Sequence, residues 1–401
     1  MGNNKNISRR NFIKGTAAGA AGLAATAVMA KASSPASAFS GPVTGWLDKW
    51  YGEKDRRDDA KLITAEDVKQ GKGNGKIRYR WNSFVFNEIM LPNGKTIVID
   101  PYWEGIENQY IADNTVPAGK WVKGADYCIL THTHGDHCAD LPSILDYYPL
   151  CQVVVPMGGL GELSNQFGLG ATRYCLLGVN GGDHLEFEDF TLDVYAGRHT
   201  FNTKQQLLTE MNNEILTNKR YQYEGGHFNA QSALHSQWGG LHFCNYMITT
   251  KPEGFKILVY GGFFIYDPFR AQVFDSQPDM MFYQAANPNL GNPYYGTNKH
   301  VDLSIKENVK TDEVASFVAS VKPGLCMPSH QEKFEMEMLN YIAGECAKVG
   351  QEQGLKTQYF VPAHNTWYVF DKDKVGNVTV TLADKEPEKQ KDPHGMSLVN
   401  S

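Results

Sequence analysis

Residues 131–137 read Thr-His-Thr-His-Gly-Asp-His, and this stretch decides how the rest of the chain is interpreted. It follows the apolar run 127–130, which predicts a buried strand. Three imidazole rings and one carboxylate are too many polar groups for a hydrophobic core. Imidazole nitrogens and carboxylate oxygens are ligands of Zn²⁺, Fe and Mn²⁺, and glycine allows a tight backbone turn. The stretch therefore predicts a metal site directly after a strand, with a solvated polar turn as the alternative.

The order of these residues resembles the His-x-His-x-Asp-His signature of the metallo-β-lactamase superfamily. Within it, the chain looks most like the branch that contains L-ascorbate-6-phosphate lactonase and related metal-dependent hydrolases, over residues 77–372. The resemblance implies an α/β fold, a four-layer αβ/βα sandwich whose site lies where the loops of the two sheets meet. It also implies two metal positions, one held by His132, His134 and His199 and the other by Asp136, His137 and His330.

Two of these ligands and one supporting residue lie far from the central stretch. His199 follows the strand-like run 190–195, and His330 follows the strand-like run 325–329. Asp100 ends the strand-like run 96–99, and the resemblance gives it the role of accepting the second N–H of a ligand histidine. An ordinary Asp-Pro turn at the end of a strand is the alternative for Asp100.

The sequence departs from the superfamily after the strand-like run 255–260. Gly262 stands where the superfamily usually has an Asp that bridges two metals. Two divalent cations about 3.5–4 Å apart repel each other, and an anionic bridge lets them share a pocket. A single metal on three histidines, with an open position for water, is therefore the alternative to a dinuclear site. Asp267 is a candidate replacement for the bridge, but its sequence Asp-Pro-Phe favours a turn.

The predicted function is hydrolysis of a small ester, lactone or phosphoester by a metal-activated water. Asp136 is expected to orient that water or relay its proton. The expected cofactor is one or two divalent metal ions, Zn²⁺ first, with Mn²⁺ or Fe as alternatives. Arg198 is a candidate contact for an anionic group of the small-molecule substrate. Gly262 leaves open a metal-containing redox protein or a non-catalytic binding protein on the same fold.

The N-terminus predicts a twin-arginine signal peptide over residues 1–38. Residues 8–14 read Ser-Arg-Arg-Asn-Phe-Ile-Lys, and an Ala- and Gly-rich stretch follows. Ala-Ser-Ala at 36–38 predicts cleavage before Phe39, with cleavage after Ala30 as the alternative. The pathway that this signal resembles carries folded proteins, so a buried metal would be bound before export. The translocation machinery is an expected partner, and the mature protein is expected to be periplasmic or extracellular.

The charge balance bears on other partners. The chain has a formal net charge of −6, and loss of residues 1–38 removes basic residues but no acidic ones. An acidic chain without a basic stripe is a poor candidate for nucleic-acid binding, which argues against the nuclease branches of the superfamily. No apolar run reaches the ~18 to 20 residues of a membrane span, so none is expected after cleavage. The oligomeric state and the substrate stay open.

The remaining sequence divides around the predicted domain. An N-terminal extension is expected at 39–76, the metallo-β-lactamase-like domain at 77–372 with an insertion at 201–238, and a polar C-terminal tail at 373–401. The chain is 42% hydrophobic over 401 residues, which is ample for a core. Its seven cysteines are odd in number and scattered, so they do not predict a disulfide framework.

Overall fold

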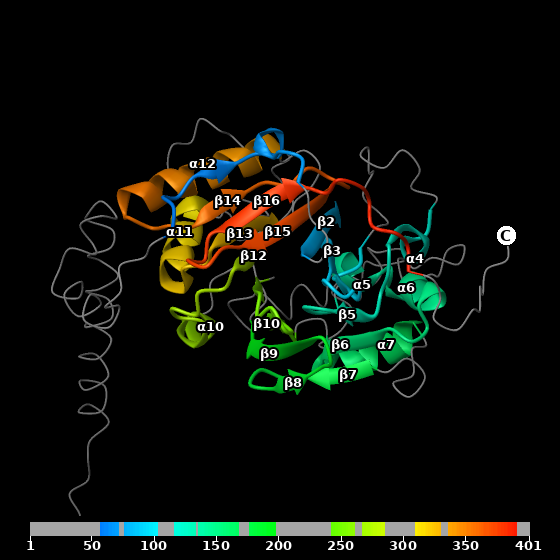
Figure 1. Ribbon diagram of the computed structural model, residues 1–401. Coiled ribbons are helices and arrows are strands. Elements are labelled where there is room, and N and C mark those ends of the chain that lie inside the picture. The colour runs from blue at the N-terminus through cyan, green and yellow to red at the C-terminus, as the bar shows by residue number, and fades with distance from the viewer. Residues whose placement is uncertain are drawn as a thin grey trace, which may run out of the picture.

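The computed structural model describes residues 57–71, 76–102, 116–133, 135–167, 176–197, 242–260, 267–284, 309–329 and 336–390. These residues form two β-sheets that pack face to face, with helices against the outer face of each sheet (Figure 1). The order of the layers is helix, sheet, sheet, helix. The predicted four-layer αβ/βα sandwich is therefore confirmed.

The first sheet, which we call the β5 sheet, carries the strand that precedes the central stretch. Its strands are β2 (Ile77–Ser83), β3 (Phe86–Met90), β4 (Thr96–Ile99), β5 (Tyr127–Ile129), β6 (Gln152–Pro156), β7 (Leu176–Val179), β15 (Trp367–Lys372) and β16 (Val378–Leu382). Their spatial order is β16-β15-β2-β3-β4-β5-β6-β7. Strands β4 to β7 are parallel, and the other neighbours are antiparallel. β6 is buried beyond its first residue, as expected for an apolar strand covered on both faces.

The second sheet, which we call the β10 sheet, is built mainly from the later part of the chain. Its strands are β1 (Leu62–Ile63), β8 (His184–Glu186), β9 (Phe190–Ala196), β10 (Cys244–Thr250), β11 (Lys256–Val259), β12 (Met280–Gln284), β13 (Leu325–Ser329) and β14 (Gln358–Phe360). Their order is β1-β14-β13-β12-β11-β10-β9-β8. The pairs from β8 to β11 are antiparallel, and those from β11 to β1 are parallel.

Helices cover the outer faces of both sheets (Figure 1). On the β5 sheet these are α4 (Ala118–Trp121), α6 (Leu141–Tyr147) and α7 (Leu160–Phe167), and on the β10 sheet they are α10 (Asp267–Gln272), α11 (Val309–Val321) and α12 (Met336–Glu352). The short helix α5 (Gly135–Cys138) and the 3-10 turns η1 (Ala65–Asp67) and η2 (Met157–Gly159) complete the described elements. In α12 the buried residues Leu339, Ile342 and Cys346 recur every three or four positions, so one stripe faces the sheet.

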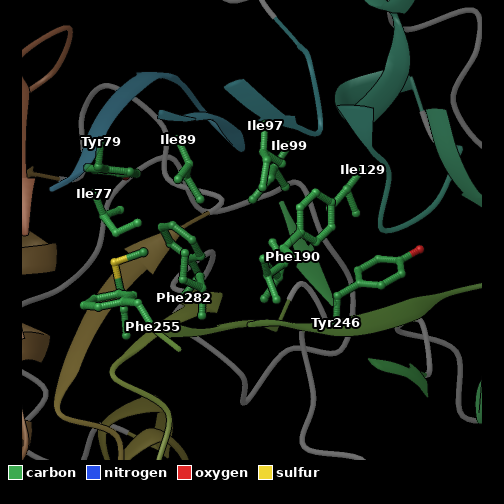
Figure 2. Close-up of a cluster of buried hydrophobic side chains, with 14 of the residues drawn as sticks. Ile77, Tyr79, Ile89, Ile97, Ile99, Ile129, Phe190, Tyr246, Phe255 and Phe282 are labelled. Atoms are coloured by element: carbon green, nitrogen blue, oxygen red, sulfur yellow. The ribbon is translucent and has the colours of Figure 1, made fainter. Parts of the chain in front are cut away.

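The main core lies between the two sheets. Figure 2 shows isoleucines of β2 to β5, with Tyr79 of β2, facing aromatic side chains of the β10 sheet. Tyr79 on β2 packs against Phe282 on β12, with ring centroids 5.7 Å apart. Tyr246 on β10 donates its hydroxyl to the carbonyl of Leu130, just after β5, at 2.7 Å. β12 therefore lies over β2, and β10 lies over β5.

One edge of the sandwich, which we call the site edge, collects the strand ends that precede the predicted ligands. β4 and β5 are parallel and end there, as do β11, β13 and β14 of the other sheet. Because β9 and β10 are antiparallel, β9 ends at the edge where β10 begins. The amide of Cys244 donates to the carbonyl of Thr131 at 3.0 Å, which joins the two sheets at this edge.

Both ends of the predicted domain differ from the expected boundaries. β1 lies in the expected extension and pairs with β14. β16 lies in the expected polar tail and pairs with β15, because Val-Thr-Val-Thr-Leu alternates like a strand despite its charged neighbours. Further on, the amide of Gln390 donates to the carbonyl of Lys123 at 2.6 Å. The sheets thus use residues on both sides of 77–372.

The turn predicted at Asp267 is wrong, because Asp267 is the first residue of helix α10. Proline is well tolerated in the first turn of a helix, where its missing N–H costs no hydrogen bond. The Asp-Pro-Phe sequence therefore begins a helix here instead of reversing the chain. Phe269 of this helix is fully buried against the β10 sheet.

Candidate metal centre

The loop after β5 is buried although it is rich in polar residues. Thr131 and His132 are each 1% exposed, and His137, on α5, is also 1% exposed. β5 lies inside a sheet that is covered on both faces. The residues that follow it therefore remain buried. Buried polar groups of this kind require hydrogen-bond partners.

Asp100 supplies most of these partners. Its Oδ1 accepts the backbone N–H of Thr131 at 2.7 Å, and its Oδ2 accepts the Thr131 hydroxyl at 2.7 Å. Oδ2 also accepts Nδ1–H of His137 at 2.8 Å. The backbone of Asp100 has a φ of 46°, in the left-handed region that Asp and Asn tolerate best after glycine. One buried carboxylate thereby fixes both the loop and a histidine.

The two described histidines of the stretch lie side by side. The ring centroids of His132 and His137 are 3.9 Å apart, with the planes at 51°. Since the Thr131 hydroxyl donates to Asp100, it accepts Nδ1–H of His132, 3.1 Å away. The network thus places a hydrogen on Nδ1 of both rings, so Nε2 is the nitrogen through which either ring would bind a metal. Two imidazoles this close, each held at Nδ1 by an oxygen, form a donor set that fits a divalent metal.

The second sheet closes the back of this loop. Phe243, just before β10, packs its ring against His132 with centroids 5.1 Å apart. Burial raises the pKa of the Cys244 thiol, which follows Phe243, to about 12. Burial likewise raises the pKa of the Cys128 thiol on β5 well above its usual value. Both thiols are thus protonated in the metal-free protein at neutral pH.

The end of β9 approaches the same place. Gly197 follows β9, and its amide donates to the carbonyl of Phe243 at 2.8 Å. A Cβ on Gly197 would lie 2.0 Å from the Phe243 ring, so only glycine fits there. The next residues are Arg198 and His199, which lie outside the described residues. Their neighbour Gly197 contacts the residue that packs on His132.

The structure does not describe the other predicted ligands. His134, His199 and His330 lie outside the described residues, as do Gly262 and the insertion at 201–238, and the side chain of Asp136 is also not described. Within the described ranges, no group of three or more His, Cys, Asp or Glu side chains lies together as a metal site. The strands before His199, Gly262 and His330 nevertheless all end at the site edge.

Three residues of this centre were not singled out by the sequence. Thr131 links Asp100 to both rings, with its hydroxyl 3.3 Å from Nδ1 of His137. Its position directly before His132 could have indicated this role, since its hydroxyl lies beside the His132 ring. Phe243 and Gly197 gave no signal, because their roles depend on how the second sheet packs against the first.

A comparison with families shows the export signal. The TAT (twin-arginine translocation) pathway signal sequence family matches residues 6–30. The chain therefore carries a twin-arginine signal, and the prediction of export by this pathway is confirmed. In the part of the chain that the structure covers, no helix combines the length and hydrophobicity that crossing a membrane requires.

A curated relative supports the predicted resemblance. A UPF0173 metal-dependent hydrolase of Cupriavidus metallidurans is 38% identical to the chain over 73 residues. The match covers 18% of this chain and only 23% of the relative. The prediction of a likeness to metal-dependent hydrolases is confirmed, whereas the lactonase branch remains a prediction.

Solved structures with a similar architecture are distant in sequence. The metallo-beta-lactamase fold protein YhfI from Bacillus subtilis is 10% identical, with a TM-score of 0.43 over 73% of this chain and 99% of that one. Unliganded yeast PDE1 is 8% identical, with a TM-score of 0.46 over 72% and 98%. Likenesses at this level carry no argument about activity, and the description of the fold rests on the strand order given above.

Proposed function

We propose that the protein is an exported, metal-dependent hydrolase of a small ester, lactone or phosphoester. The observation that carries this proposal is the buried network of Asp100, Thr131, His132 and His137 at the site edge. Carboxylates and hydroxyls that hold the Nδ1 side of buried histidines are the usual support of histidine metal ligands. The similarity to a metal-dependent hydrolase and the export signal agree with it.

The proposed ligands of the first metal are His132, His134 and His199. The contact between Gly197 and Phe243 supports the placement of His199, because it brings the end of β9 to the residue packed on His132. A three-histidine site leaves an open position for water, as catalytic zinc requires. We take Zn²⁺ as the first candidate, with Mn²⁺ or Fe as alternatives.

The proposed ligands of a second position are Asp136, His137 and His330. The hydrogen bond from His137 to Asp100 supports this assignment, because a ligand histidine commonly donates its other N–H to a carboxylate. Gly262 cannot bridge two metals through a side chain. Asp267 begins a helix, and whether it or another carboxylate replaces the bridge decides between one ion and two.

The chemistry follows from these positions. A bound divalent metal lowers the pKa of water towards neutrality and polarises the oxygen of the scissile bond. Asp136 is proposed to orient the attacking water or to relay its proton. Arg198 is proposed to hold an anionic group of the substrate. Asp100 and Thr131 hold the two described histidines at Nδ1 and thereby fix the orientation of both rings.

The test is a hydrolysis assay on the exported, mature protein. We expect metal-dependent turnover of at least one chromogenic ester, lactone or phosphoester, loss of turnover with a chelator, and recovery when Zn²⁺, Mn²⁺ or Fe²⁺ is added. His134→Ala should abolish turnover, whereas His184→Ala, which changes an exposed histidine, should not. Absence of turnover for all three substrate classes in the metal-loaded protein would contradict the proposal.

Gly262 favours one alternative, a metal-containing protein with redox or binding activity and no hydrolysis. This alternative predicts bound iron with a visible absorption spectrum that changes on reduction. The hydrolase predicts activity with Zn²⁺, which has no redox chemistry. Activity restored by Zn²⁺ alone therefore separates the two.

A further inference from the structure

The turn η2 packs against the loop after β5. It directly follows β6, and β6 is parallel to β5, so both strands end at the site edge. A Cβ on Gly159 of this turn would lie 2.4 Å from Cγ2 of Thr133, the residue directly after His132. Glycine, which has no side chain, lets the turn approach the loop this closely. The turn therefore borders the candidate metal centre.

His242, the residue before Phe243, contacts the same turn. The backbone N–H of Gly158 donates to Nδ1 of His242 at 2.8 Å, and a Cβ on Gly158 would lie 2.8 Å from Cβ of His242. On its other side in the chain, Phe243 packs its ring against His132. His242 is thus tied to the loop after β5 in two ways, through η2 and through Phe243.

The hydrogen bond from Gly158 determines which nitrogen of His242 carries a hydrogen. A backbone N–H can only donate, so Nδ1 of His242 accepts, and the neutral ring then has its hydrogen on Nε2. Burial lowers the pKa of His242, so the ring is neutral at pH 7. His132 and His137 have the opposite arrangement, with a hydrogen on Nδ1. Nε2 of those two rings suits a metal, whereas Nε2–H of His242 suits an oxygen acceptor.

We propose that His242 donates a hydrogen bond from Nε2 to a carbonyl or phosphoryl oxygen of the substrate. His242 is partly exposed, and its Nε2 makes no hydrogen bond to another of the described residues. This inference rests on the proposed hydrolase function and names a residue for that reaction outside the metal ligands. A fixed N–H of this kind stabilises an oxygen that gains negative charge as water attacks. The bond from Gly158 supplies the fixed orientation.

Two variants separate this role from mere support of the η2 turn. Asparagine places an oxygen near the position of Nδ1, so His242→Asn still accepts from Gly158 but loses the donor at Nε2. Glutamine places its NH₂ near Nε2, so His242→Gln keeps a donor and loses the acceptor. We expect His242→Asn to melt like the wild type with kcat/KM lowered about tenfold or more, and His242→Gln to melt lower but retain more of kcat/KM. A wild-type kcat/KM in His242→Asn, or a larger loss in His242→Gln, would overturn the proposal.

A second measurement does not depend on activity. Calorimetric titration of the metal-loaded protein with inorganic phosphate should give a dissociation constant about tenfold higher for His242→Asn than for the wild type. His184→Asn, which changes an exposed histidine of the β8–β9 hairpin, should bind phosphate like the wild type. This pattern in a protein that hydrolyses nothing would support the donor and refute the hydrolase. Equal dissociation constants for the wild type and His242→Asn, or no binding by the wild type, would overturn the donor, whatever the activity.

Discussion

Two pairs of a histidine and an aspartate in the described part of the chain look alike in chemistry and differ in setting. His137 and Asp100 are 2.8 Å apart, with side chains 1% and 4% exposed. His184 and Asp193, on the β8–β9 hairpin, are 2.6 Å apart, with side chains 50% and 41% exposed. A short contact alone therefore does not mark a functional site. Burial distinguishes the two pairs, because the polar groups of a buried pair must be compensated by the residues around them.

The surroundings of the two pairs differ accordingly. Asp100 also accepts two hydrogen bonds from Thr131, which fix the loop and, through the threonine hydroxyl, a second histidine. The exposed pair adds only Glu186, whose carboxylate also contacts Lys251. The hydrogen bonds of Asp100 hold the buried pair in one geometry. The exposed pair belongs to a set of surface ion pairs that contribute little to the free energy of unfolding.

The largest expected effect comes from Asp100→Asn. Asparagine tolerates the left-handed backbone at this position, but its NH₂ group cannot accept the hydrogen bonds now made by Oδ2. We expect a loss of about 1–3 kcal/mol in the free energy of unfolding and a 10- to 100-fold loss of metal affinity. Urea unfolding and metal titration measure these quantities. Asp193→Asn is the matched control, and an equal loss there would break the comparison.

The next effect tests how the second sheet supports the buried pair. Gly197→Ala places a Cβ against the Phe243 ring, next to His132 and before His199. We expect a destabilisation of about 1–3 kcal/mol, with weaker metal binding. Gly161→Ala on α7 is the control, because nothing lies within 4 Å of its added Cβ. If Gly197→Ala unfolded at the same urea concentration as Gly161→Ala, the close approach of β9 to Phe243 would be refuted.

A third prediction concerns how the stability of the protein changes with pH through His364, on the loop between β14 and β15. Burial lowers the pKa of His364 to about 4, so between pH 6.5 and 4 the unfolded state binds more protons and stability falls as the pH falls. His364→Phe should reduce the loss of stability between pH 7 and pH 4.5 by on the order of 1 kcal/mol. Thermal melts across this range measure the slope. An identical slope in wild type and variant would show that His364 is not buried in its neutral form.

The smallest effect is expected at His184. Hydrogen bonds that His184 donates to Asp193 and then to Glu186 raise the pKa of His184, so any stabilisation is present at low pH and fades as the pH rises through the raised pKa. Because the pair is exposed, His184→Ala should leave the free energy of unfolding close to that of the wild type, at pH 5 as at pH 8. A larger change at pH 5 in low salt would mean that the surface cluster is more than a set of screened ion pairs.

The sequence was a good guide where hydrophobic runs are bounded by turn residues. The runs 127–130, 152–156, 190–195 and 325–329 correspond to β5, β6, β9 and β13, because buried central strands need continuous or alternating apolar residues. β1 is only two residues long, and it depends on its partner β14, so no local pattern predicts it. Asp267 was misread because an Asp-Pro pair serves both a turn and the start of a helix.

In the candidate centre, too, residues in local sequence patterns could be predicted, whereas contacts between the two sheets could not. The histidines of the stretch and Asp100 could be named in advance, since both follow apolar strands. The contacts of Thr131 with Cys244, and of Gly197 with Phe243, join residues far apart in the chain and depend on how the sheets stack. Such contacts carry no local sequence signal. The roles of His199 and His330 as ligands remain predictions, supported by the strands that end at the site edge.

The most direct test of the central claim is the metal content of the exported, mature protein, measured by elemental mass spectrometry beside His132→Ala and His184→Ala. The account predicts about one equivalent of a divalent metal in the wild type and in His184→Ala, and none in His132→Ala. Two equivalents in the wild type would mean that another group replaces the carboxylate missing at Gly262. Wild-type protein without metal, or His132→Ala with its metal retained, would contradict the claim that the buried loop after β5 is a metal centre.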